Sequence, residues 1–231
     1  MTIPPARGGV GVLQDSGVAK LTDFLIEYLG DWPGTPGLTI AGAEVRIRPG
    51  WDGQLREVVG VGSPQSAVIS VPPSSATLAR DRVLSWEQAQ AALPEVFARP
   101  DSRVYYGTFR WTYQPTDLPD AGVWIPADDP LVPPWLHPFG GDVLMTLIDG
   151  KYAAGVGIKR HNASGLEISV GTEPEHRGKG LAAGLVAQAA RWILAQDAVP
   201  IYLHDPANVA SDRTANAAGF PDEGWQILGM G

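Results

Sequence analysis

Apolar and polar positions follow two different periods on either side of a glycine-rich turn in the last third of the chain. Leu166, Ile168 and Val170 alternate with polar or small residues, which is the period of a half-buried strand. From Leu181 onward the apolar residues recur at helical spacing. The segment 166–193 therefore predicts a strand, a short turn and a helix.

The other elements of the C-terminal half follow from the same two periods. Strands are expected over 142–148, 151–160, 200–204 and 225–228, and a short helix over 208–218. The Asp149-Gly150 pair between the first two of these strands is typical of a two-residue hairpin turn. The predicted order of this half is three strands, helix, strand, helix and strand.

The N-terminal half also mixes helices with strands. Its expected elements are helical stretches over 18–28, 72–82 and 85–97 and strands over 38–47, 58–61, 67–71 and 103–113. The segment 67–80, AVISVPPSSATLAR, combines a strand with a helix entry but has no glycine-rich turn between them. This half is therefore an α/β pattern and, by hypothesis, a degenerate copy of the C-terminal unit.

A segment dense in proline and acidic residues joins the two halves. Its composition predicts a connection or an extended lid, because proline cannot serve in central strands or helix interiors. Four large side chains stand out near it: Trp124, Trp135, His137 and Phe139. We expect them to anchor a long loop, and a role in binding substrate is the alternative. The predicted domains are 1–115, the connection 116–139, and 140–231.

Composition changes this picture in two ways. The chain has 231 residues, no cysteine and a net charge of −8, so thiolate metal sites, disulfides and a cysteine nucleophile are excluded. Residues 116–231 hold seven basic against fourteen acidic residues, which argues against nucleic acid as a partner. No signal-peptide pattern and no apolar run of membrane-spanning length occurs, so a cytoplasmic location without a membrane partner is expected.

The turn between strand and helix has the chemistry of an anion site. Gly178 and Gly180 leave the backbone uncovered, and Arg177 and Lys179 add positive charge beside it. A glycine-rich turn that opens a helix offers unpaired N–H groups and the positive end of the helix dipole, so a phosphorylated ligand is expected. The spacing fits neither a Walker A loop nor a dinucleotide-binding G-x-G-x-x-G.

The string R-x-x-G-x-A, Arg177 to Ala182, after V-G-T-E-P-E-H resembles the pyrophosphate loop of GCN5-related N-acetyltransferases (the GNAT superfamily), in particular its FR47-like branch. A second match lies downstream, where Asn208 and Gly219 are eleven residues apart and Ser211 fills a small-residue position. Asn208 and Gly219 also suit helix N-cap and C-cap positions. The resemblance covers about residues 140–231 and implies an α/β (α+β) GNAT fold, a mixed central sheet flanked by helices.

The resemblance also implies a cofactor, acetyl-CoA, and the residues that bind it; no metal is expected. Backbone groups of the key strand would hold the pantetheine and polarise the acetyl carbonyl, the loop would hold the pyrophosphate, and the following helix would flank the arm. The implied residues are Val170, Gly171, Thr172, Arg177, Gly178, Lys179, Gly180, Leu181, Ala182, Asn208 and Ser211.

The sequence indicates the proton donor and the general base less clearly than the cofactor residues. Many family members have a tyrosine seven residues after the motif asparagine as the proton donor to the thiolate, but this chain has Ala215 there, with Tyr202 and Ser211 as the nearest replacements. An amine acceptor needs a base before it can attack a thioester. Glu167, on the key strand, ranks first as that base, and His161 and His204 are the alternatives.

The predicted function is transfer of an acetyl group from acetyl-CoA to a primary amine of a small molecule or peptide, by direct attack in a ternary complex. The missing tyrosine motivates one alternative, a non-catalytic CoA-binding or regulatory module. A degenerate interaction scaffold is a third reading, disfavoured by the intact loop glycines. No pattern in the chain specifies the acceptor or the oligomeric state.

Overall fold

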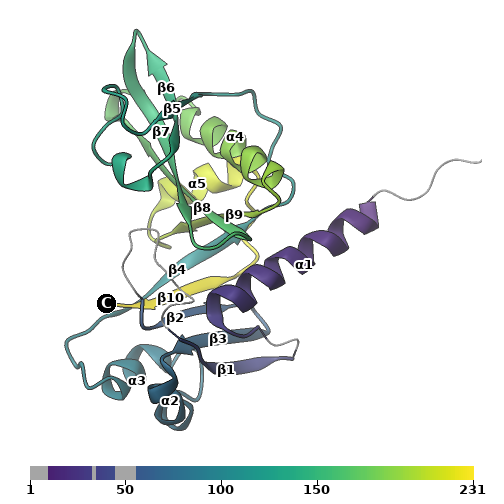
Figure 1. The fold of residues 1–231 in the computed structure, drawn as a ribbon, viewed down its shortest axis with the longest axis vertical. Coiled ribbons are helices and arrows are strands. Elements are labelled where there is room, and N and C mark those ends of the chain that lie inside the picture. Colours follow the sequence, from purple (N-terminus) through teal and green to yellow (C-terminus); the bar gives the residue numbers. More distant parts are fainter. Residues whose placement is uncertain (1–9, 33–34, 45–55) are drawn as a thin grey trace, which may run out of the picture.

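A computed structural model describes residues 10–32, 35–44 and 56–231. Its ten strands form one sheet in the order β1-β3-β2-β10-β4-β9-β8-β7-β6-β5 (Figure 1). The strands are β1 Gly37–Gly42, β2 Val59–Gly62, β3 Ser66–Val71, β4 Val104–Trp111, β5 Val123–Pro126, β6 Asp142–Ile148, β7 Lys151–Arg160, β8 Gly165–Thr172, β9 Val199–His204 and β10 Gln226–Met230. The α-helices are α1 Val10–Leu29, α2 Ala76–Arg82, α3 Ala89–Val96, α4 Leu181–Ala195 and α5 Val209–Ala218.

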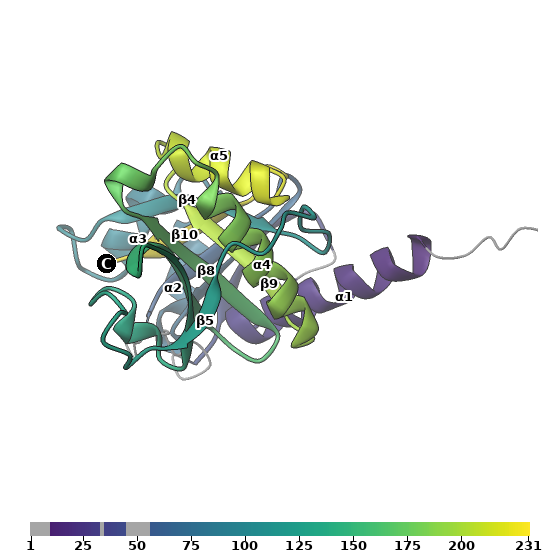
Figure 2. The same cartoon turned by 90° about the horizontal axis from the view of Figure 1, so that it is seen from above.

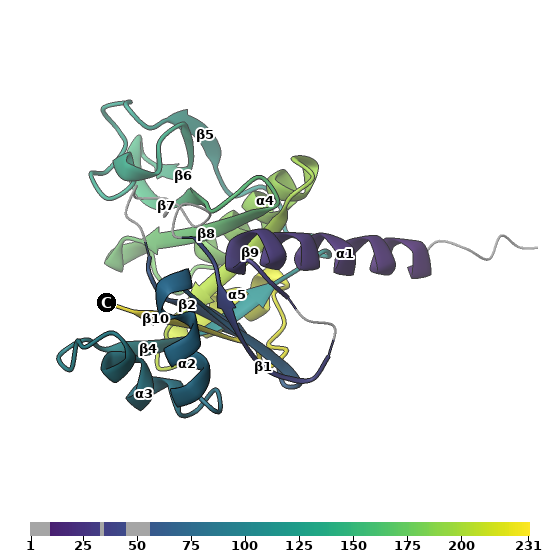
Figure 3. The same cartoon turned by 60° about the horizontal axis from the view of Figure 1, so that its bottom comes forward.

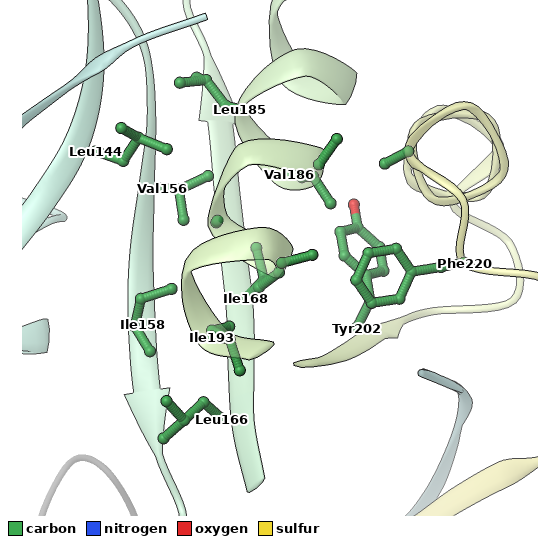
Figure 4. Packing of buried hydrophobic residues seen from close by; sticks show 14 of the residues in the cluster. Leu144, Val156, Ile158, Leu166, Ile168, Leu185, Val186, Ile193, Tyr202 and Phe220 are labelled. Atoms are coloured by element: carbon green, nitrogen blue, oxygen red, sulfur yellow. The ribbon is translucent and has the colours of Figure 1, made fainter. Parts of the chain in front are cut away.

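The helices cover the two faces of the sheet unequally (Figures 2 and 3). Helices α4 and α5 pack on β6 to β9, where Leu185, Val186 and Ile193 of α4 meet Val156 and other buried strand side chains (Figure 4). Helices α2 and α3 pack on the strands of the N-terminal half. Helix α1 lies on the opposite face, where its buried side chains contact β2, β3, β4 and β9.

The predicted order of the C-terminal half is confirmed as β6, β7, β8, α4, β9, α5 and β10. Asp149 and Gly150 both have positive φ, 53° and 72°, as the hairpin turn requires. The fold is thus a mixed α/β sheet flanked by helices, as expected.

Several boundaries differ from the prediction. Helix α1 begins at Val10 rather than near residue 18, and residues 45–47 of the expected strand 38–47 lie outside the described residues. The connection contains a strand that its composition did not predict, β5. This strand pairs only with β6 at the edge of the sheet, where Pro126 costs no ladder hydrogen bond.

Strands from both halves of the sequence intermix in the sheet. The strand β4 lies between β9 and β10, and β10 in turn pairs with β2. The division into domains at 1–115 and 140–231 therefore stays a prediction. The placement of β4 joins the N-terminal strands to β9, and so to the strands of the C-terminal half.

The pairing pattern supports the hypothesis of a degenerate internal copy. Read from β1, the series β1-β3-β2-β10-β4 has one parallel pair followed by three antiparallel pairs, and so does the series β9-β8-β7-β6-β5. In each series the second strand leads through a short 3-10 turn into a helix, at Pro73–Ser75 before α2 and at Pro174–His176 before α4. The copy remains a hypothesis.

Candidate active site

The strands β8 and β9 separate within the sheet. They pair in parallel only from Gly165 with Val199 to Glu167 with Ile201, although β8 continues to Thr172. On its other side β8 stays paired with β7 as far as Thr172. Residues 168–172 thus have an edge that faces β9 without strand pairing, and an extended ligand can lie against such an edge.

The turn after β8 leads into the N-terminus of α4. Gly178 and Gly180 have φ of 72° and 80°, which a side chain would disfavour. Gly180 is the N-cap of α4, so no side chain caps the helix, and its first turn carries no acidic residue. The Arg177 Nε donates to the carbonyl oxygen of Thr172 at 3.2 Å, which fixes the stem of that arginine beside the turn. The first N–H groups of α4 are therefore positioned for an anion.

A cavity of about 680 Å³ lies between this turn, the separated strands and α5. We call it the cofactor cavity, after the ligand that the sequence predicts. All eleven residues that the sequence implied for the cofactor line it: Val170, Gly171, Thr172, Arg177, Gly178, Lys179, Gly180, Leu181, Ala182, Asn208 and Ser211. Arg213 adds a third basic side chain, and none of the described residues in its wall is acidic. In a chain of net charge −8, this positive cavity is suited to phosphate groups.

Asn208 has the capping role that its position suggested. Its Oδ1 accepts from the Ser211 N–H at 3.0 Å at the start of α5, and Gly219, with φ of 88°, ends that helix. Both Asn208 and Ser211 still line the cofactor cavity. A cap that fixes the first turn of α5 thereby also fixes part of the cavity wall.

Tyr202 occupies the region where the family tyrosine is missing. Its side chain is 2% exposed, lines the cofactor cavity and lies beside the Ser211 side chain. Figure 4 shows the ring beside Phe220, with its hydroxyl directed towards the space between α4 and α5. The small Ala215 is fully buried in the same cluster. Burial raises the pKa of the Tyr202 hydroxyl, against the opposing effects of Ser211 and Arg110.

Arg110 anchors α5 to the sheet. Its side chain is fully buried on β4, directly opposite Tyr202 of β9, and it pairs with Asp212 of α5. It also donates to Asn216 Oδ1 at 2.9 Å and to the carbonyl oxygen of Phe220 at 3.0 Å. Sequence reasoning missed this residue, although a single arginine within the otherwise uncharged stretch 104–113 was the available signal.

A second cavity, of about 530 Å³, brings the three candidate bases together. Glu167, His161 and His204 all line it. Its wall is built from six strands that are neighbours in the sheet, from β2 to β7, together with Tyr28 of α1. We call it the acceptor cavity, because it is separate from the cavity that the predicted cofactor residues line and is where the predicted amine acceptor would bind.

Glu167 is held by a lysine and a histidine in the acceptor cavity. Lys159 Nζ lies 2.7 Å from Oε1 and His161 Nε2 lies 2.8 Å from Oε2. Burial alone would raise the pKa of the Glu167 carboxyl, but the hydrogen bonds and charges of His161 and Lys159 outweigh it and lower that pKa. The carboxylate is therefore ionised and its oxygens are engaged, which makes it a weak proton acceptor.

His204 presents an unused ring nitrogen. Its Nδ1 lies 2.9 Å from the carbonyl oxygen of Asp205, which can only accept, so Nδ1 carries a proton. In the neutral ring Nε2 is then an acceptor, and this buried atom has no hydrogen-bond partner. His204 is 9% exposed and lies three residues beyond the last β8–β9 pair, as Val170 does on β8. The imidazole thus lies at the same distance along the sheet as the unpaired part of β8.

The N-terminal half lacks an equivalent opening. Its parallel strands β1 and β3 pair along all six residues, from Gly37 with Ser66 to Gly42 with Val71. The turn after β3 contains two prolines and no glycine. Both features differ from the C-terminal half, where β8 and β9 separate and the turn contains Gly178 and Gly180.

Two further features concern metals and membranes. Within residues 10–32, 35–44 and 56–231, no three His, Asp or Glu side chains are grouped so that they could hold a metal ion. In the same residues no helix combines the length and the apolar character needed to cross a bilayer.

Three solved structures are similar to this chain over part or most of its length. A GNAT-family protein from Novosphingobium aromaticivorans is 25% identical, with 57% of this chain and 67% of that one covered and a TM-score of 0.46. A GNAT-family acetyltransferase from Colwellia psychrerythraea is 16% identical, with 61% and 62% covered and a TM-score of 0.45. A GCN5-related N-acetyltransferase-like protein from Streptococcus suis is 15% identical, with 92% and 99% covered and a TM-score of 0.48.

The family assignment rests on a different comparison. No curated protein matches the chain. The model of the Acetyltransferase (GNAT) family matches residues 104–220, which is more than half of the chain and includes the glycine-rich turn, the Asn208 motif and both cavities' central strands. The FR47-like branch is not distinguished by this match. The chain belongs to the GNAT acetyltransferase family and is an acyltransferase.

Proposed function

We propose that this protein transfers an acetyl group from acetyl-CoA to a primary amine by direct attack in a ternary complex. The proposal rests on one observation: two neighbouring side chains at the end of β9 line two different cavities. Tyr202 lines the cofactor cavity, His204 lines the acceptor cavity, and their ring centroids are 6.2 Å apart. Donor and acceptor bound in these cavities would therefore meet beside these two side chains.

The cofactor cavity suits CoA in charge and in shape. The pyrophosphate would bind the first turn of α4 with Arg177 and Lys179 beside it. The pantetheine would lie along the unpaired edge of β8, where amide groups of Val170 to Thr172 can bind it as a neighbouring strand would. An N–H of this edge would polarise the thioester carbonyl and stabilise the oxyanion that forms during attack.

His204 would accept the proton that the amine loses. The amine nitrogen forms a bond to the acetyl carbon, and a proton passes from that nitrogen to Nε2, directly or through a water molecule. The Nδ1–H bond to the Asp205 carbonyl supports this role because it keeps Nε2 available as the acceptor. Glu167, which ranked first from the sequence, is instead bound by Lys159 and His161 and would help to shape and charge the acceptor cavity.

Tyr202 would donate a proton to the leaving thiolate. When the carbon–sulfur bond breaks, sulfur takes the hydroxyl proton and solvent later restores it. The raised pKa supports this role, since the hydroxyl stays protonated near neutral pH. Ala215 is fully buried in the same core cluster, and a strand tyrosine would take over from the missing helix tyrosine.

A specific observation favours a second candidate, a CoA-binding module without catalysis: the usual tyrosine position is Ala215. Calorimetric titration with acetyl-CoA, followed by thiol release over a panel of polyamines, aminoglycosides, amino acids and peptides, separates the two. The proposal expects binding together with thiol release that depends on one class of amine. Binding without release from any amine supports the module, and no binding at millimolar acetyl-CoA contradicts both.

A further inference from the structure

Three side chains of the loop before β6 fill places that glycines leave open on β7 and β8. A Cβ added at Gly155 would lie 2.8 Å from Leu136, one at Gly157 2.4 Å from Phe139, and one at Gly171 2.8 Å from the Trp135 ring. Gly155 pairs with Gly171 in the sheet, and Lys159 and Glu167 pair further along the same two strands. The loop therefore covers the face of β8 that also carries Glu167, which is the face of the acceptor cavity.

Trp135 differs from its neighbours in this loop. Leu136 is fully buried and anchors the segment, whereas Trp135 is 38% exposed, although its ring edge presses against Gly171. The indole makes edge-on contact with Phe139 and lies beside Tyr152, whose hydroxyl donates to the Gly171 carbonyl at 3.3 Å. An exposed indole fixed from two sides is a rigid wall rather than a simple anchor.

Gly171 is also a wall residue of the cofactor cavity, on the edge of β8 that β9 leaves unpaired. A thioester bound along this edge has α4, α5 and Tyr202 on one face of the sheet and the Trp135 ring on the other. The acyl group must turn towards the second face, because the acceptor cavity with Glu167 lies there. An acyl chain longer than acetyl then runs towards the indole.

From these contacts we infer that Trp135 determines which acyl-CoA the enzyme accepts, by restricting the donor to short acyl groups. The inference rests on the proposed function, because it requires CoA in the cavity described above. A rigid ring over Gly171 leaves no room for added methylene groups, and each methylene that a pocket excludes changes selectivity by about tenfold or more. Removing the indole opens that space without changing the pyrophosphate turn.

The test measures binding, so that it does not depend on the unidentified amine. The protein and its Trp135→Ala and Trp135→Phe variants are titrated calorimetrically with CoA, acetyl-CoA, butyryl-CoA and hexanoyl-CoA. We expect the unaltered protein to bind acetyl-CoA at least about tenfold more tightly than hexanoyl-CoA. Trp135→Ala should remove this difference, and Trp135→Phe should reduce it. Equal chain-length dependence in all three proteins would overturn the inference.

The matched control is Trp124→Phe, which shrinks another indole of the same connection. Trp124 packs against Trp192 of α4, on the other face of the sheet, so its variant should keep the chain-length dependence of the unaltered protein. Melting temperatures show whether each variant is folded, and Trp135→Phe keeps an aromatic ring if the alanine variant is unstable. If the unaltered protein fails to bind CoA itself, the proposed function fails; if it binds CoA but shows no dependence on Trp135, only the inference fails.

Discussion

The rings of Tyr202 and His204 lie 6.2 Å apart on one strand, yet the first lines the cofactor cavity and the second lines the acceptor cavity. Both side chains belong to β9 beyond the point where it leaves β8. The separation of the two strands therefore produces an unpaired edge of β8 and also brings the proposed proton donor and the proposed proton acceptor to the same place.

Replacing His204 by Asn removes Nε2 but keeps an amide N–H that can donate to the Asp205 carbonyl. We expect kcat/KM to fall by about 10²–10⁴-fold, the usual contribution of a general base. The affinity for CoA, measured by calorimetry, should change little. Glu167→Gln is the comparison, and if it abolishes turnover while His204→Asn does not, Glu167 rather than His204 is the base.

Replacing Tyr202 by Phe keeps the ring in the core and removes only the hydroxyl. We expect kcat to fall by about 10²-fold with CoA affinity unchanged. Because the pKa of Tyr202 is raised above its ordinary value of 10.0, the hydroxyl is protonated throughout the range from about pH 7 to 9. The rate ratio of the two proteins should be constant over that range and shrink only above about pH 10. An equal rate for both proteins would rule out Tyr202 as the donor.

Local features of this fold could be predicted from the sequence, and long-range ones could not. The hairpin at Asp149-Gly150 and the turn at Gly178 depend on neighbouring residues, and both occur where expected. The neutralisation of Glu167 by Lys159 and His161 depends on strand register, and the Arg110–Asp212 pair joins residues 102 positions apart. For this reason the sequence ranks Glu167 first as the base, whereas the proposal assigns that role to His204. Residue type indicates intrinsic proton affinity, but it does not show which partners already engage a side chain.

The position of β4 in the sheet could not be predicted from the sequence either. Its sequence predicts a strand but not its neighbours, and pairing with β9 places Arg110 beneath α5 and Tyr105 in the wall of the acceptor cavity. The N-terminal half thereby contributes to the wall of the acceptor cavity, although the motifs that identify the family lie in the C-terminal half.

Gly180→Ala tests the geometry of the pyrophosphate turn. A Cβ at this position meets no atom within 4 Å, so the cost comes only from the φ of 80° and should be about 1–2 kcal/mol. If the turn moves to relieve that strain, affinity for CoA should fall by about tenfold. Gly150→Ala is the matched control, since its φ is 72° and its Cβ also meets nothing, but it lies in the hairpin between β6 and β7. Equal CoA affinity for both variants would argue against a binding role for the turn.

Arg110→Ala should destabilise the protein by about 3 kcal/mol, the usual cost of breaking a buried ion pair. The residue is fully buried, and its loss frees Asp212, Asn216 and the Phe220 carbonyl at once. Arg110→Met should cost less, because it retains most of the volume. Chemical denaturation gives both values, and Asp222→Asn serves as the control, since that half-exposed carboxylate lies 3.4 Å away and should contribute less than about 1 kcal/mol. Equal stability of Arg110→Ala and the unaltered protein would contradict the anchoring role.

The cluster of Lys159, Glu167 and His161 predicts how stability depends on pH. The pKa of Glu167 is lowered in the folded protein, so its contribution is fully present above the unfolded value of about 4.3 and is lost as pH falls through the lower folded value. Glu167→Gln should therefore reduce the free energy of unfolding at pH 7, on the order of 3 kcal/mol, and the gap should narrow below about pH 4.3. Urea denaturation from pH 7 to pH 3.5 measures this difference in the free energy of unfolding. The control is Glu175→Gln, which changes an exposed glutamate. A gap of the same size at every pH would show that the loss comes from packing and not from the charge of the carboxylate.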